Sequence, residues 1–90
     1  MRILALNYRD RKHPAAGGAE MHFHKIFSRI ATAGNEVVLF TTAFPGAPVR
    51  ETVDGILVIR CGGDLAYQWN VARNFRKLDS EFHFDFVYED

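Results

Sequence analysis

The fold is decided near the amino terminus, where the sequence reads RILALN at residues 2–7, Gly17-Gly18 after a polar loop, and EVVLFTT at residues 36–42. The first, continuous apolar run is typical of a strand that is covered on both faces. The second run is rich in the β-branched and aromatic residues that strands favour. Between them, residues 19–33 place apolar side chains at a helical period. A strand, a helix and a strand in this order predict a crossover that joins two parallel strands.

The rest of the sequence extends this unit into a larger sheet. Asp54-Gly55, between two short apolar runs, is typical of a hairpin turn. Asp64 is a suitable N-cap for a second amphipathic helix, and an aromatic-rich run near the end predicts a last strand. The predicted segments are a loop at residues 43–48, a hairpin at 50–60, a helix at 65–80 and a strand at 82–88. We therefore expect an α/β fold, a Rossmann-like and mostly parallel sheet flanked by helices.

Composition narrows the functional classes. The chain has 90 residues, of which 48% are hydrophobic, and this favours a packed core over disorder. Eleven basic and eleven acidic residues give a net charge of zero, which argues against a nucleic-acid partner. Cys61, the single cysteine, allows neither an intrachain disulfide nor a cysteine-based metal site. The apolar residues 3–6 are too few for a signal peptide or a membrane span, so we expect a cytoplasmic protein.

The candidate binding motif is Gly17-Gly18, directly before the first predicted helix. Free backbone N–H groups and the positive end of the helix dipole meet there, and glycine leaves room for a phosphate. A diphosphate is the natural ligand, and a plain flexible turn is the alternative. A dinucleotide-binding fingerprint or a Walker loop is excluded, because the loop is long and Gly18 is followed by Ala19-Glu20. Glu20 itself is interpreted as a structural residue of the first helical turn.

Other candidates lie where strands end. Arg9, Asp10 and His13 belong to the loop after the first strand and are candidate substrate-loop residues, as is Glu89 after the last strand. For each of them a solvated surface residue is the alternative. His22 and His24 are two apart on a predicted helix and do not share a face, so surface residues are favoured over a metal pair. No metal site is predicted.

An ordered set of short motifs resembles a known family. The set comprises MRILALN at residues 1–7, GGAE at 17–20, GNEVV at 34–38, Pro45-Gly46, Glu51 with Asp54-Gly55, Val58 with Arg60 and Gly62-Gly63, and the aromatic strand that ends in Glu89-Asp90. Together they resemble the start of family 4 glycosyltransferases, which are retaining enzymes of the GT-B architecture. The resemblance implies that residues 1–90 form the first half of the N-terminal, acceptor-side Rossmann-like domain, without the C-terminal donor-binding domain.

The resemblance also implies a function. Such an enzyme transfers a hexose-type sugar from a nucleotide-diphosphate sugar to an acceptor, without a metal cofactor. Gly17 and Gly18 would face the donor diphosphate, the C-terminal domain would be the main partner, and the full-length enzyme would associate peripherally with membranes. The 90-residue piece alone is expected to be inactive. The alternatives are a stand-alone, non-catalytic module of flavodoxin-like or regulatory type, and another nucleotide-sugar enzyme of the same half-fold, such as an epimerase.

Overall fold

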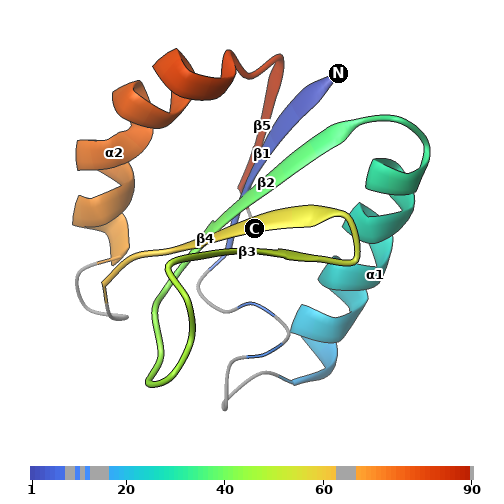
Figure 1. Cartoon of the computed structure of the whole chain (residues 1–90), viewed down its shortest axis with the longest axis horizontal. Coiled ribbons are helices and arrows are strands. Elements are labelled where there is room, and N and C mark those ends of the chain that lie inside the picture. Colours follow the sequence, from blue (N-terminus) through green and yellow to red (C-terminus); the bar gives the residue numbers. More distant parts are fainter. Residues whose placement is uncertain (8–9, 11, 13–16, 63–66, 90) are drawn as a thin grey trace.

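The chain folds into a mixed sheet with helices on opposite faces (Figure 1). The computed structural model describes residues 1–7, 10, 12, 17–62 and 67–89. The strands are ordered β3-β4-β2-β1-β5, and β3 runs antiparallel to β4 while the other pairs are parallel. In chain order the elements are β1 (Arg2–Leu6), α1 (Gly18–Thr32), β2 (Glu36–Thr41), β3 (Arg50–Val53), β4 (Ile56–Arg60), α2 (Tyr67–Phe82) and β5 (Phe86–Glu89).

The predicted βαβ crossover is present. β1 and β2 are parallel neighbours, and their register pairs Ile3 with Val37 and Leu6 with Phe40. The helix between them, α1, ends at Thr32, and Gly34 follows with a φ of +99°. Glycine adopts this left-handed backbone without strain, so it turns the chain from the helix into β2. The predicted fold class is confirmed.

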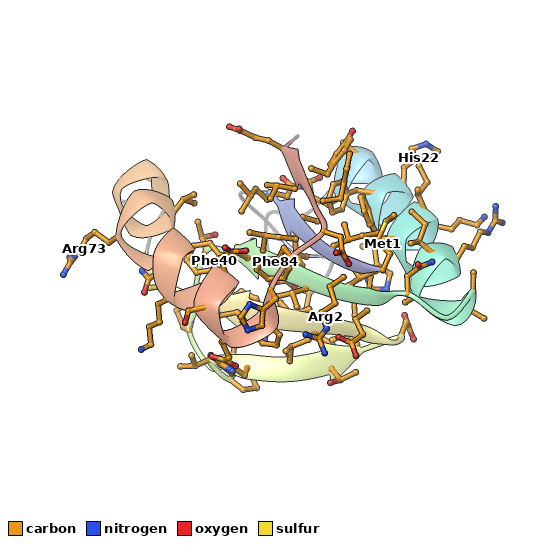
Figure 2. All side chains as sticks on the ribbon, turned by 90° about the horizontal axis from the view of Figure 1, so that it is seen from above. Met1, Arg2, His22, Phe40, Arg73 and Phe84 are labelled. Atoms are coloured by element: carbon orange, nitrogen blue, oxygen red, sulfur yellow. The ribbon has the colours of Figure 1, made fainter. Side chains whose placement is uncertain are left out.

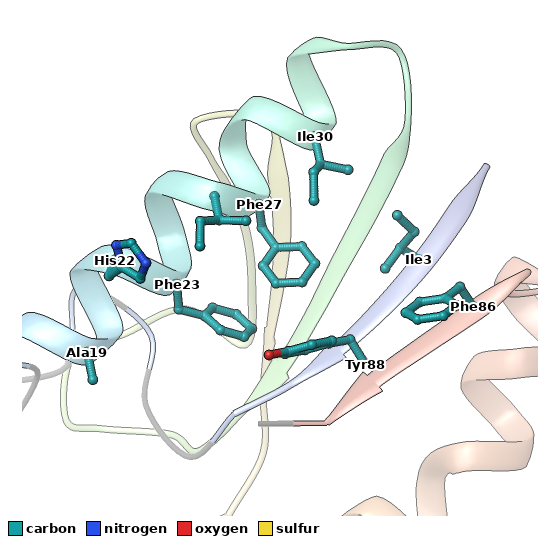
Figure 3. Close-up of a pocket in the computed structure, with 9 residues that line it drawn as sticks. Ile3, Ala19, His22, Phe23, Phe27, Ile30, Phe86 and Tyr88 are labelled. Atoms are coloured by element: carbon teal, nitrogen blue, oxygen red, sulfur yellow. The ribbon is translucent and has the colours of Figure 1, made fainter.

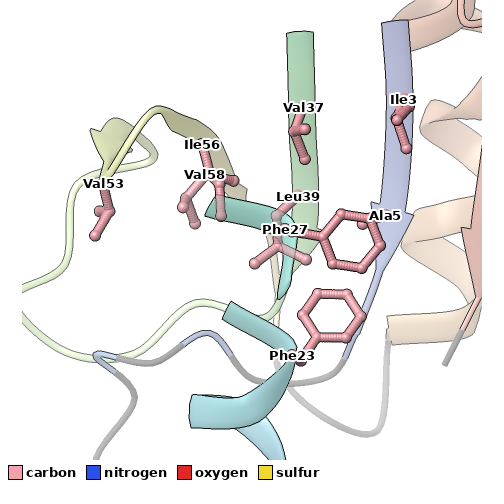
Figure 4. Packing of buried hydrophobic residues seen from close by; sticks show 9 residues of the cluster. All are labelled: Ile3, Ala5, Phe23, Phe27, Val37, Leu39, Val53, Ile56 and Val58. Carbon is pink, nitrogen blue, oxygen red and sulfur yellow. The ribbon is translucent and has the colours of Figure 1, made fainter. Parts of the chain in front are cut away.

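Alternate residues of the strands point to opposite faces of the sheet and form two separate cores. On the α1 side, Phe23 and Phe27 cover the sheet, and their ring centroids are 4.6 Å apart. Each fully buried aliphatic or aromatic side chain stabilises the fold by roughly 1.5–3 kcal/mol relative to an exposed one. The buried residues of this core, shown in Figure 4, are Ile3, Ala5, Phe23, Phe27, Val37, Leu39, Val53, Ile56 and Val58.

The α2 side carries the second core. Its buried members are Leu4, Leu6, Val38, Phe40, Ile59 and Leu78. Seen along the sheet in Figure 2, Phe40 lies between the sheet and α2, whereas Arg73 of α2 and His22 of α1 point outward on opposite sides. The alternation of the two cores along β1 and β2 explains why these strands read as continuous apolar runs.

The hairpin between β3 and β4 forms as the Asp54-Gly55 pair predicts. Both residues have positive φ, 50° for Asp54 and 84° for Gly55, as a tight two-residue hairpin requires. The turn is also tied to α1, because His24 Nε2 lies 2.8 Å from Asp54 Oδ2. His24 is 7% exposed, so the prediction of a surface residue is wrong for His24. The buried face of α1 extends beyond its apolar stripe to contact this turn.

The boundary between α2 and β5 differs from the prediction. The helix continues to Phe82 instead of ending at residue 80, and the strand begins at Phe86 instead of residue 82. Asp79, in the last turn, binds the chain just after the helix: its carbonyl accepts from the His83 N–H over 2.6 Å, and its Oδ1 accepts from the Phe84 N–H over 3.2 Å. Phe82 and Phe84 stack with centroids 5.6 Å apart. Their aromatic character reflects packing against the core on the α2 side and not a strand. The predicted N-cap, Asp64, lies outside the described residues.

Candidate functional site at the carboxyl edge of the sheet

The carboxyl ends of the parallel strands meet along one edge of the sheet. In register near that edge lie Leu6 of β1, Phe40 of β2, Ile59 of β4 and Glu89 of β5. The first turn of α1 lies at the same end of the strands (Figure 1). Because ligands of open α/β sheets bind outside this edge, which we call the carboxyl edge, it is where a functional site is expected.

A buried ion pair lies at the carboxyl edge. Arg60, the last residue of β4, is 2% exposed, and Asp10, in the connection between β1 and α1, is 3% exposed. Arg60 Nε donates to Asp10 Oδ2 over 2.8 Å, and Arg60 Nη2 donates to Asp10 Oδ1 over 3.2 Å. This two-point contact fixes both the position and the plane of the carboxylate.

The same guanidinium holds the segment before β3 and β3 itself. Arg60 Nη1 donates to the Pro48 carbonyl over 3.1 Å and to the Glu51 carboxylate over 2.6 Å. Its Cζ lies 5.0 Å from the centroid of the Phe44 ring, within the range of a cation–π contact. The hydrogen bond to Asp10, more than the other contacts, raises the pKa of Arg60 above its ordinary value. Arg60 is therefore a permanent cation that organises its surroundings and does not exchange protons.

Lys12 adds a second link from the same connection. Its backbone N–H donates to Asp10 Oδ1 over 2.8 Å, and its Nζ lies 3.0 Å from Glu51 Oε1. Hydrogen bonds from Lys12 and then from Arg60 lower the pKa of the Glu51 carboxyl below its ordinary value of 4.5. Glu51 is consequently ionised at neutral pH and bridges two cations.

The glycine pair lies at the start of α1 and is exposed. Gly17 precedes the helix with an extended backbone, and Gly18 is its first residue. A Cβ built on Gly18 would meet no atom within 4 Å, so the space beside its backbone is open. The Gly17 N–H is not free, because it donates to Glu20 Oε2 over 2.9 Å. Glu20 thus has the structural role at the helix start that the sequence indicates.

A buried hydroxyl lies close to the ion pair. Thr41 ends β2, pairs in register with Arg60, and is 0% exposed. Strand alternation places it on the α1 side with Val37 and Leu39. Within the described part of the chain, its Oγ1 is the buried side-chain atom that lacks a hydrogen-bond partner. Such a group costs roughly 1–3 kcal/mol when it stays unsatisfied.

The predicted site residues are only partly brought together. Gly17 and Gly18 lie at the carboxyl side of the sheet, and Glu89 ends β5 at its carboxyl edge with an exposed side chain. Asp10 lies in the expected connection, but both its carboxylate oxygens are bonded to Arg60, so its contact with a substrate stays a prediction. Arg9 and His13 lie outside the described residues. The roles of these residues as ligand contacts are all still predictions.

Arg60, Lys12 and Thr41 were not predicted as site residues from the sequence, and Arg60 was noted only as part of a family-like motif. A charged residue that closes the buried run of β4 is the signal that could have identified Arg60, since buried arginine is rare unless it is paired. His22 is exposed and His24 is bonded to Asp54, and they do not form a metal pair. Among the described residues, no group of three or more metal-ligating side chains comes together.

A second concave surface lies on the far side of α1. An apolar groove of about 410 Å³ runs between α1 and β5, and its walls include Phe23, Phe27, Phe86 and Tyr88 (Figure 3). The Tyr88 ring centroid lies 5.4 Å from that of Phe27. All four residues of β5 are exposed. This lining suits an apolar occupant and offers little to a diphosphate, so the groove is distinct from the candidate site.

Comparison with known proteins identifies the fold. The chain is similar to a solved sucrose-phosphate synthase from Thermosynechococcus elongatus, with a TM-score of 0.73 over 98% of this chain. The chain has a Rossmann-like α/β fold that matches one fragment of this GT-B structure. The structural similarity establishes the architecture. The sequence identity is only 17%, so the activity is left open. No protein-family model matches the chain, and a search of curated proteins finds no match.

The match covers a limited part of the synthase. The chain spans about a quarter of that protein, 26% of its length. The Rossmann-like sheet and the position of the first helix are therefore shared with one segment of a larger enzyme. Neither α1 nor α2, the helices in the part of the chain that the structure describes, is long and apolar enough to cross a membrane.

Proposed function

We propose that the chain belongs to the acceptor side of a retaining glycosyltransferase that takes a hexose-type sugar from a nucleotide-diphosphate donor. The family proposed is family 4, and the enzyme would act without a metal cofactor. Residues 1–90 would supply the first half of the N-terminal domain, and a C-terminal domain would bind most of the donor. The proposal also includes a cytoplasmic enzyme that associates peripherally with membranes.

The exposed glycine pair at the carboxyl side of a GT-B-type sheet is the observation that carries the proposal. At a helix start the backbone N–H groups point toward solvent and the helix dipole is positive, so an anionic group is favoured there. The open space beside Gly18 allows a diphosphate to approach the backbone. The diphosphate is the leaving group of sugar transfer, and stabilising its growing negative charge lowers the barrier.

The Glu20 carboxylate sets a condition on this proposal. It occupies the Gly17 N–H in the ligand-free protein, so an incoming diphosphate takes its place there or binds at Gly18. Like charges repel, and Glu20 must turn away when the ligand binds. Gly17 and Gly18 are exposed, so a ligand can reach this helix start from solvent.

The acceptor would lie beside the same edge. The segment around Phe44 and Pro48 is held by Arg60, and Glu89 ends β5, on the far side of β1, with an exposed carboxylate. A carboxylate at a strand's carboxyl end can accept hydrogen bonds from sugar hydroxyls. We propose Glu89, with the loop residues Arg9 and His13, as acceptor-side contacts.

The experiment is an assay of the complete gene product with UDP-, GDP- and ADP-glucose. We expect release of a nucleoside diphosphate from one of these donors, at the same rate with and without EDTA. Proton NMR of the released or transferred glucose should show the donor's anomeric configuration at the earliest time points. If none of the three donors binds or reacts, the proposal is wrong.

A further inference from the structure

Arg60 connects segments that the sequence separates. Its guanidinium bonds to Asp10 in the connection before α1, to the Pro48 carbonyl, and to Glu51 in β3. The Arg60 side chain is 1% exposed and that of Asp10 is 2% exposed. Breaking the contact between Arg60 and Asp10 destabilises the fold, because each charge would be left buried and unpaired.

The Asp10 end of the ion pair lies in the same connection as the glycine pair. β1 ends at Leu6 and α1 begins at Gly18, so a long connection precedes the helix start. Asp10 is fixed by Arg60, and Lys12 is fixed by its bonds to Asp10 and Glu51. Gly17 follows Lys12 by five residues in the sequence. A fixed point this close in the chain restricts the positions open to Gly17.

We propose that Arg60 is a positioning residue for nucleoside-diphosphate binding, acting through Asp10 to hold the connection that presents Gly17 and Gly18. This inference rests on the proposed function and adds to it a residue that does not touch the ligand. The geometry requires arginine, since a lysine cannot bond Asp10 at two points while also bonding Pro48 and Glu51.

The rival explanation is that the ion pair only stabilises the fold. The two explanations differ when stability is restored without the ion pair. Replacing a buried ion pair by apolar residues of similar volume is often neutral or stabilising. A double variant, Asp10→Leu with Arg60→Met, leaves neither member of the pair as a buried, unpaired charge and should therefore be more stable than a variant that removes only one of the two charges, yet it lacks the hydrogen bonds that orient the connection.

The test uses the complete gene product and three probes, UDP, GDP and ADP, titrated by calorimetry. Asp10→Asn, Arg60→Lys and the double variant are compared with the wild type, at a temperature at which circular dichroism shows each to be folded. Two controls separate other effects. Arg50→Lys weakens an exposed two-point pair with Glu81, whose bonds are 2.8 and 3.1 Å long, and Leu78→Ala weakens the α2 core. Hydrogen exchange at the Lys12, Gly17 and Gly18 amides is measured on the same samples.

We expect all three site variants to bind the preferred diphosphate about tenfold more weakly, and to exchange these amides faster, because a displaced binding group loses much of its effect. Arg50→Lys and Leu78→Ala should keep the wild-type affinity, although Leu78→Ala melts at a lower temperature. Wild-type affinity in the double variant would overturn the positioning role and leave the proposed function intact. Failure of the wild type to bind any of the three probes would overturn both.

Discussion

The Gly17 N–H donates to the Glu20 carboxylate over 2.9 Å, so the helix start that we propose for a diphosphate already holds an anion from its own first turn. This contact satisfies one of the unpaired donors of α1 and places negative charge at the positive end of the helix dipole. It also makes Glu20 a competitor for any phosphate at Gly17. The same residue therefore has opposite effects on stability and on ligand binding.

Removing this carboxylate separates the two effects. Glu20→Ala should destabilise the fold by roughly 0.5–1 kcal/mol, because the helix start loses its charge complement. It should strengthen nucleoside-diphosphate binding several-fold, because no carboxylate has to leave. Glu36→Ala is the matched control, since it removes the same charge from a residue paired with Arg2 at the start of β2. Thermal unfolding and calorimetric titration of UDP, GDP and ADP measure the two effects, and weaker binding by Glu20→Ala would contradict the placement of the ligand.

The ionisation of Glu51 should contribute to the pH dependence of stability. Hydrogen bonds from Lys12 and Arg60 lower the pKa of this carboxyl in the folded protein below 4.5. The unfolded chain therefore takes up protons first as the solution is acidified. The contribution of Glu51 is fully present above pH 4.5 and is lost as the pH falls through the lower pKa of the folded state.

Glu51→Gln should accordingly flatten the fall of stability below that pH. Glu81 offers a second case, because Arg50 lowers the pKa of its carboxyl in the same direction. Urea unfolding from pH 7 down to pH 3 measures the effect for both Glu51→Gln and Glu81→Gln. Curves that stay parallel to the wild type throughout would show that these carboxyls are not held by their cations.

The unpartnered hydroxyl of Thr41 gives a prediction with an unusual sign. Thr41→Val replaces a buried polar atom without a partner by a methyl group of similar size. The substitution should raise the free energy of unfolding of the ligand-free protein by about 1 kcal/mol. Chemical denaturation measures this change. A loss of more than that amount would show that the hydroxyl has a partner in solution, such as an ordered water.

Much of the fold could be predicted because local signals and tertiary packing agree. The apolar run at residues 3–6 and the pair Asp54-Gly55 each favour one structure, and the sheet and hairpin form accordingly. The end of α2 could not be predicted, because Phe82 and Phe84 have high strand propensity, but Phe82 is the last residue of α2 and Phe84 stacks on it. Their environment, which the sequence does not state, overrides the propensity.

The site was less accessible to prediction for a physical reason. Gly17 and Gly18 are recognisable because a phosphate-binding helix start has a local pattern. Arg60 and Asp10 are fifty residues apart in the sequence. They meet because β2 pairs with both β1 and β4, which places the end of β4 near the connection that follows β1. His24 was likewise taken for a surface residue, because its partner Asp54 lies thirty residues further along the chain.

The most direct measurement is diphosphate binding by Gly18→Ala in the complete gene product. A Cβ at Gly18 meets no atom of the protein within 4 Å, so the folded structure accepts it, and alanine favours the helix by up to about 1 kcal/mol. Gly34→Ala is the control, because its φ of +99° makes any side chain there strained. We predict that Gly18→Ala melts no lower than the wild type but binds UDP, GDP or ADP at least about tenfold more weakly, whereas Gly34→Ala melts lower and keeps the affinity. Wild-type affinity in Gly18→Ala would contradict the claim that the helix start receives the diphosphate.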